Sequence, residues 1–214
     1  MVSSKDTSKV VDMCSDEKNS AKPSRDEAEE AVRVLLRYIG ENPKREGLVD
    51  TPARVIRAYD EFFEGYCQDP AAELGKTFED IEGFDDIVLV KDIEFTSHCE
   101  HHMVPINGVA HVAYWPDKAV VGISKLARIV DIYSKRLVSQ ENMTNGIANC
   151  IEDTLKPKGV AVYIDADHQC MSIRGVKKRQ SSTVTTTFRG RLQDDHSAQM
   201  RFLTMIGEQK KYLK

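Results

Sequence analysis

The densest group of reactive side chains in this sequence lies in the stretch 97–102, which reads Ser-His-Cys-Glu-His-His. Thiolates and imidazoles are preferred zinc ligands, and two ligands separated by two residues can reach one ion from a single loop. Cys99 and His102 have this separation, whereas His101 is one residue closer to Cys99. The spacing therefore favours Cys99 and His102 as a pair of zinc ligands.

A second cluster of the same residue types is needed, because two protein ligands do not make a zinc site. The stretch 167–170, Asp-His-Gln-Cys, is the other place where Cys and His cluster, and it follows a predicted strand. Strand ends can meet across a sheet even when a long stretch of chain separates them. We therefore predict a zinc site formed by Cys99, His102 and Cys170. Its fourth tetrahedral position stays open for water, as in catalytic zinc sites.

Two other interpretations of these clusters remain open. If His101 or His168 were a fourth ligand, the site would be closed and the zinc would only stabilise the fold. The clustered side chains could also be unrelated core residues, since buried cysteine is common in proteins. Cys14, Cys67 and Cys150 have no neighbouring His, and we predict no metal-binding role for them.

Basic residues in two places suggest an anion site. Ser124, Lys125 and Arg128 open a predicted helix, where unpaired backbone N–H groups and the helix dipole favour negative charge. Arg174 closely follows Cys170, so a phosphate clamp and a metal could act on one ligand. The alternative is an ordinary solvated helix face and, for the basic run 177–179, a charged turn.

Gln140 and Glu141 lie between two predicted helices. A carboxylate beside an amide matches the N1–H and 2-amino donors of a guanine edge. An exposed glutamate in a helix connection is the commoner explanation, so these two residues alone do not define a site.

Composition limits the class of protein. The 214 residues carry a net charge of -4 with a pI near 5.9, which argues against a surface that grips nucleic acid over its whole extent. The N-terminus lacks the apolar core of a signal peptide, and no later run is long enough to span a membrane. We therefore predict a cytoplasmic protein. The odd count of five cysteines makes a disulfide framework improbable and favours free thiols.

The pattern of apolar residues predicts the elements that must position these groups. We expect helices over 24–39, 51–65, 124–133, 143–155 and 197–206, and strands over 87–96, 106–115, 119–123, 159–165 and 182–189. Ser24 with Glu27 forms a capping box, Thr51 and Ser124 are expected as N-caps, and Asn107-Gly108 and Pro116-Asp117 are expected as turns. The order predicts an α+β domain in which an antiparallel four-stranded sheet is backed by a helix pair. We divide the chain into a flexible tail (1–22), an N-terminal helical region (23–86) and a catalytic domain (87–214).

Taken in order, these motifs resemble the GTP cyclohydrolase I family. The matching stretches are 51–54, 97–102, 122–126, 136–141, 168–171 and 174–175, within a likeness that runs from about residue 26 to residue 206. The resemblance implies the tunnelling fold, assembled as a homodecamer with active sites between neighbouring subunits. It also implies hydrolytic opening of the imidazole ring of GTP, with release of formate and formation of 7,8-dihydroneopterin triphosphate. This product begins pterin and tetrahydrofolate biosynthesis, and the family includes allosteric enzymes.

The resemblance also implies a role for each matching residue. Cys99, His102 and Cys170 would hold Zn²⁺, and His101, His168 and Ser124 would move protons, with His168 as the acid that protonates N7. Gln140 and Glu141 would bind the guanine. Ser124, Lys125, Arg128 and Arg174 would bind the triphosphate, with Arg128 supplied across a subunit boundary. Gly146 departs from the family pattern, which has a larger polar residue there.

Two rival functions fit parts of the sequence. A non-catalytic zinc module could bind nucleic acid through residues 174–191, which would require a fourth protein ligand, and the overall acidity counts against it. Another tunnelling-fold enzyme could act on a different pterin or deazapurine, but it would not need the Cys99, His102 and Cys170 trio.

Overall fold

The computed structural model describes residues 22–75, 77–78 and 83–207, so nearly all of the predicted tail lies outside the described residues. The chain divides into two compact units, one up to Gln68 and one from Asp69. The division falls earlier than the boundary expected at 86/87, because Leu74 is fully buried in the core of the second unit. No helix in the described ranges is long and apolar enough to cross a membrane.

The first unit contains two helices, α1 (Arg25–Tyr38) and α2 (Thr51–Phe62), followed by a short 3-10 helix η1 (Glu64–Cys67). The predicted capping box is confirmed. The Ser24 hydroxyl accepts from the Glu27 N–H (3.2 Å), and the Glu27 carboxylate accepts from the Ser24 N–H (2.8 Å). The N-cap of α2 is Asp50 and not Thr51, which is already the first helical residue. The helix therefore starts one residue earlier than the sequence predicted.

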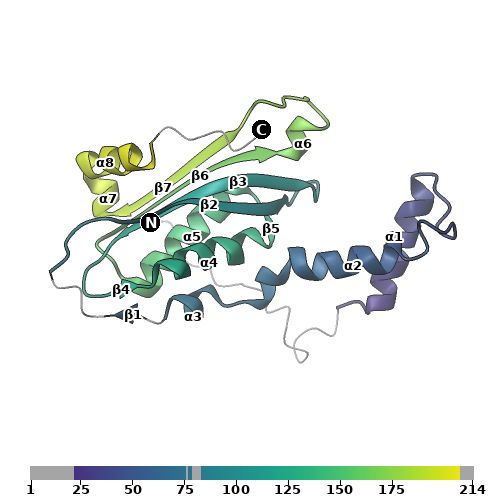
Figure 1. Cartoon of the computed structure of the whole chain (residues 1–214), viewed down its shortest axis with the longest axis horizontal. Coiled ribbons are helices and arrows are strands. Elements are labelled where there is room, and N and C mark those ends of the chain that lie inside the picture. The colour runs from purple at the N-terminus through teal and green to yellow at the C-terminus, as the bar shows by residue number, and fades with distance from the viewer. Residues whose placement is uncertain (1–21, 76, 79–82, 208–214) are drawn as a thin grey trace, which may run out of the picture. The chain divides into compact units, whose positions relative to one another are not determined.

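The second unit is built on a five-stranded sheet with the order β5-β2-β3-β6-β7 (Figure 1). The four long strands are antiparallel, as predicted: β2 (Val88–Cys99), β3 (Pro105–Trp115), β6 (Gly159–His168) and β7 (Thr183–Gly190). The fifth strand, β5 (Leu137–Val138), runs parallel to the end of β2 and was not predicted, because two residues carry no alternation signal. Of the predicted strand 119–123 only β4 (Val120–Val121) forms. It pairs with β1 (Thr77–Phe78) outside the main sheet.

The prediction of a turn at Asn107-Gly108 is wrong, because both residues lie inside β3, paired with β2 and β6. The glycine serves a different purpose. A Cβ atom on Gly108 would lie 2.6 Å from the Asp165 carbonyl oxygen and 2.6 Å from the Ala166 Cβ. Glycine at this position therefore lets the backbone of β6 approach closely.

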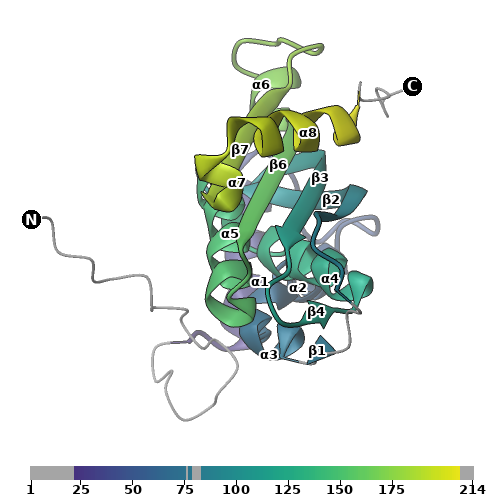
Figure 2. The same cartoon turned by 90° about the vertical axis from the view of Figure 1, so that its left-hand side faces the viewer.

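Helices cover both faces of the sheet (Figures 1 and 2). The predicted pair, α4 (Ile123–Ser134) and α5 (Gln140–Leu155), packs on one face, and α8 (His196–Ile206) packs on the other. Alternate strand residues point to the two cores: Val112 and Val162 towards α4 and α5, Ala113 and Ala161 towards α8. Short helices α3 (Pro70–Leu74), α6 (Gln169–Ser172) and α7 (Arg191–Asp194) complete the unit. The α+β fold with a helix pair behind an antiparallel sheet is thus confirmed.

Gly146 of α5 has a packing role. A Cβ atom at this position would lie 2.6 Å from Cε1 and 3.0 Å from Cδ1 of the Tyr133 ring, which comes from α4. The glycine therefore makes room for an aromatic side chain between the two helices.

We expect Gly146→Ala to destabilise the protein even though alanine favours helix formation by about 1 kcal/mol. Overpacking against a ring that cannot withdraw freely typically costs about 1–3 kcal/mol, so the balance should favour unfolding. Urea denaturation would measure the change. The exposed neighbour Asn142→Ala is the matched control and should not destabilise. If Gly146→Ala is equally unfavourable in a Tyr133→Leu background, the ring is not the cause.

Candidate metal centre and active site

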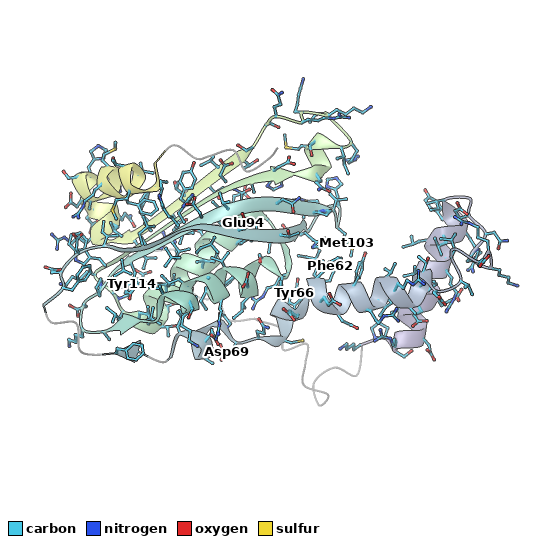
Figure 3. All side chains as sticks on the ribbon, in the orientation of Figure 1. Phe62, Tyr66, Asp69, Glu94, Met103 and Tyr114 are labelled. Carbon is cyan, nitrogen blue, oxygen red and sulfur yellow. The ribbon has the colours of Figure 1, made fainter. Side chains whose placement is uncertain are left out.

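The turn between β2 and β3 brings one cluster of ligating side chains together. The Cys99 carbonyl oxygen accepts from the N–H groups of His102 (3.3 Å) and Met103 (2.8 Å), and the Cys99 N–H donates to Val104 O (3.0 Å). Met103, which is labelled at this turn in Figure 3, adopts a left-handed conformation with φ 54°. The tight turn folds the His102 side chain back towards the Cys99 thiol.

The second cluster reaches the same end of the sheet from the other side of β3. In the strand register, His98 of β2 lies opposite Pro105, and His168 of β6 lies opposite Ile106. The clusters of β2 and β6 therefore both lie at the end of the sheet where β3 begins. Cys170 follows on α6, which starts directly after β6.

Three ligand atoms meet at this end of the sheet. One atom each from Cys99, His102 and Cys170 lie within 4.8 Å of one another, and the Cys99 Sγ is 3.9 Å from the His102 Nδ1. Zinc–ligand bonds of about 2.0–2.3 Å in a tetrahedron place ligand atoms about 3.3–3.8 Å apart, so a small contraction would complete the site. His101 Nδ1 is 3.5 Å from the Cys99 Sγ, yet His101 is not in this group and its side chain is 66% exposed.

The surroundings of the Cys170 thiol affect its protonation. Burial, followed by the nearby Cys99 thiol, raises the pKa of the Cys170 thiol. The Cys170 thiol must therefore lose its proton when it binds a metal ion, and the cation would stabilise the resulting thiolate. Cys99, Cys150 and Cys170 are free thiols, whereas Cys67 is disulfide-bonded, contrary to the expectation of free thiols.

His168 is held by a buried amide. Its Nε2 lies 2.7 Å from the Gln140 Oε1. The Gln140 Nε2 donates to Thr183 O (2.9 Å), Thr185 Oγ1 (3.1 Å) and Ile164 O (3.2 Å), so the amide is oriented with its oxygen towards His168. An amide oxygen can only accept, and the imidazole proton therefore lies on Nε2. Burial lowers the pKa of His168, while the charges of Glu141 and Asp167 act in the opposite direction.

These contacts give Gln140 a partner that sequence reasoning missed. Gln140, whose guanine-binding role stays a prediction, is buried, and its amide group contacts His168 and three groups of β6 and β7. No sequence signal points to this contact. Glu141 is the next residue along α5, exposed and near enough for its charge to act on His168. Arg174 also lies at this site, with its Nη1 3.3 Å from the His102 Nε2.

Ser124, Lys125 and Arg128 do not join this group within one chain. They lie in the first turns of α4, next to Val121, whose N–H donates to the Tyr114 hydroxyl (3.0 Å) at the far end of β3. Tyr114 and Met103 mark these two opposite ends in Figure 3. Ser124 is not the helix cap that was predicted, because Gly122 occupies the N-cap position. Lys125 and Arg128 contact Glu73, a residue that the sequence had not singled out.

Comparison with known proteins identifies relatives over most of the chain. The profile of the family described as GTP cyclohydrolase I matches residues 28–207. The chain is 58% identical to a GTP cyclohydrolase 1 of Sinorhizobium fredii and 55% identical to one of Maricaulis maris, each over 187 residues that cover 87% of this chain and 91% of the relative. It is also 55% identical to a GTP cyclohydrolase 1 of Brucella suis over 201 residues, 94% of each protein. A profile match of this extent and identities this high show that the chain belongs to the GTP cyclohydrolase I family.

Proposed function

We propose that this protein is a GTP cyclohydrolase I, which hydrolyses the imidazole ring of GTP, releases formate and forms 7,8-dihydroneopterin triphosphate. The observation that carries the proposal is the convergence of Cys99, His102 and Cys170 beside His168, at one edge of the sheet. Family membership supports the same reaction. A cytoplasmic location and a place in pterin and tetrahydrofolate biosynthesis belong to the same proposal.

Zinc is the metal that the ligand set fits best, because two thiolates and one imidazole with an open fourth position match catalytic zinc sites. When bound, zinc supplies a nucleophilic hydroxide near neutral pH by lowering the pKa of water. Among the residues that the structure describes, the ligating group has three members and not four. This count favours the open catalytic site over the closed structural site of a nucleic-acid-binding module.

His168 would supply the proton that the purine N7 needs when the ring opens. Its Nε2–H is committed to Gln140, so the proton for transfer would be carried on Nδ1 when the ring is protonated. The amide contact fixes the orientation of the imidazole, which a general acid requires. His101, exposed at the same turn, and Ser124 would move protons in the later ribose rearrangement and ring closure.

The substrate would bridge two chains. Glu141 and Arg174 lie at the end of the sheet that carries the predicted metal ligands. Glu141 would contact the guanine, and Arg174 would contact a phosphate. Ser124, Lys125 and Arg128 lie at the opposite end of the sheet. A neighbouring copy of the chain would therefore have to place its own three residues beside the metal ligands of this copy. This geometry supports a homo-oligomer with shared active sites, for which we propose the decamer.

The direct test is incubation of the zinc-loaded protein with GTP. We expect formate to be released and, after oxidation, a fluorescent pterin to appear, in equal amounts. Turnover that is absent with zinc loaded and the oligomer intact would contradict the proposed function. Guanosine without phosphates should be a poor substrate, because the basic residues would then have no partner.

A further inference from the structure

Glu73 stands between the two basic residues of α4. A single carboxylate oxygen, Oε1, lies 2.7 Å from the Lys125 Nζ and 2.8 Å from the Arg128 Nη1. Glu73 belongs to α3, a one-turn helix that Asp69 caps by accepting from the N–H groups of Ala71 (2.9 Å) and Ala72 (3.3 Å). Leu74, the next residue, is fully buried. The carboxylate therefore belongs to an element that a capping residue and a buried side chain hold in place.

The charges of this triad do not cancel. Hydrogen bonds from Lys125 and then from Arg128 lower the pKa of the Glu73 carboxyl, so the carboxylate is ionised at neutral pH. Two cations and one anion leave one positive charge. The Lys125 and Glu73 side chains are only 19% and 26% exposed, so water screens their contact less than it would screen an open surface pair.

The shared oxygen accepts one hydrogen bond from each cation, as a phosphate oxygen also can. Carboxylate and phosphate oxygens accept the same charge-assisted hydrogen bonds from ammonium and guanidinium groups. A phosphate that takes the place of this oxygen has to displace Glu73, and a phosphate that binds the remaining N–H donors of Lys125 and Arg128 lies beside the negative charge of Glu73. A ligand that needs a minor, displaced state binds more weakly by the fraction of molecules in that state.

We propose that Glu73 is a built-in anion that competes with the triphosphate for Lys125 and Arg128. The inference rests on the proposed function, in which these two residues receive the triphosphate. A singly charged anion gains too little to displace the carboxylate, whereas a polyphosphate carries enough charge to do so. Glu73 is a positioning residue that acts through Lys125 and Arg128, and it selects for highly charged ligands.

The test compares Glu73→Gln with the wild-type chain, both full-length, zinc-loaded and oligomeric. Glutamine keeps the size of the side chain and its acceptor oxygen but removes the charge. Inorganic tripolyphosphate is titrated by calorimetry, with zinc content measured before and after. We expect tripolyphosphate to bind about three- to tenfold more tightly to the variant, because the competing anion is gone. Guanosine, which has no phosphate, should bind equally to both proteins.

Asp153→Asn is the matched control. It also removes one carboxylate charge, from an exposed pair with Lys156 (3.4 Å) in the same unit, and it should leave tripolyphosphate affinity unchanged. Glu73→Ala should tighten binding in the same direction as Glu73→Gln. Unchanged or weaker tripolyphosphate binding in Glu73→Gln overturns the proposal. Weaker binding in Glu73→Ala alone would also overturn it and make Glu73 a clamp that holds the two cations in place.

The failure of this proposal can be told apart from failure of the proposed function. Tripolyphosphate binding needs no turnover, and formate release by the wild-type protein is measured separately. If the wild-type protein releases formate and the Glu73→Gln variant binds tripolyphosphate with unaltered affinity, only the proposed role of Glu73 is contradicted. Tighter polyphosphate binding without any formate release would support Glu73 and contradict the cyclohydrolase activity.

Discussion

The Cys170→Ala variant is expected to lose bound zinc and formate release together. Cys170 brings to the site the one ligand that does not come from the β2–β3 turn. Without it, Cys99 and His102 would be left as a two-ligand site, which holds the ion too weakly to resist a chelator. We expect at least about a hundredfold loss of activity, because mutating a residue that only supports a metal ligand already costs about 10–100-fold. Metal analysis after dialysis against a chelator, with a formate assay on the same sample, measures both.

Two variants serve as controls for this experiment. Cys150→Ala removes a buried thiol far along α5 from the ligand group and should keep its zinc. His101→Ala removes an imidazole that lies near the Cys99 Sγ but outside the group, and it should also keep zinc while losing turnover. Zinc content of wild-type level in Cys170→Ala would contradict the ligand assignment. Metal loss in His101→Ala as large as in His102→Ala would mean that the two imidazoles have exchanged roles.

The second large effect is expected for His168→Ala, which should retain zinc and GTP binding while ring opening slows. Losing a positioned general acid usually costs about a hundredfold or more in rate. His168 lies two residues before Cys170, but its Nε2 is hydrogen-bonded to Gln140 and it is not part of the ligand group. A GTP binding isotherm, metal analysis and the formate assay on this one variant separate the three properties.

The outcomes for His168→Ala distinguish three roles. Retained metal with slow formate release supports the acid. Retained metal with unimpaired formate release would remove that role. Lost metal would make His168 a fourth ligand and return the site to the closed, structural type. A thermal unfolding measurement on the same sample shows whether a loss of activity only reflects a loss of fold.

Much of this protein could be predicted from short stretches of sequence. The capping box of Ser24 and Glu27, the apolar stripe of α5 and the alternation along β6 are local patterns, and each formed the element expected of it. The proximity of Cys99 and His102 could also be predicted, because the spacing of two residues on one turn determines whether their side chains can meet. The same kind of local rule misjudged Asn107-Gly108. A glycine required by a neighbouring strand looks identical in sequence to a glycine required by a turn.

Only the tertiary structure decided which distant residues meet. Gln140 reaches His168 across 28 positions, and Glu73 reaches Lys125 and Arg128 across 52 and 55. Such contacts depend on strand register and on the placement of helices against the sheet, and no local spacing encodes either. The structure likewise places Lys125 at the opposite end of the sheet from the predicted metal ligands, although Lys125 and these ligands belong to one set of family motifs. The sequence by itself determined the residue types available for chemistry and the elements that carry them. The packing of those elements decided which side chains share a site, because side chains on separate elements meet only where the whole core brings their backbones together.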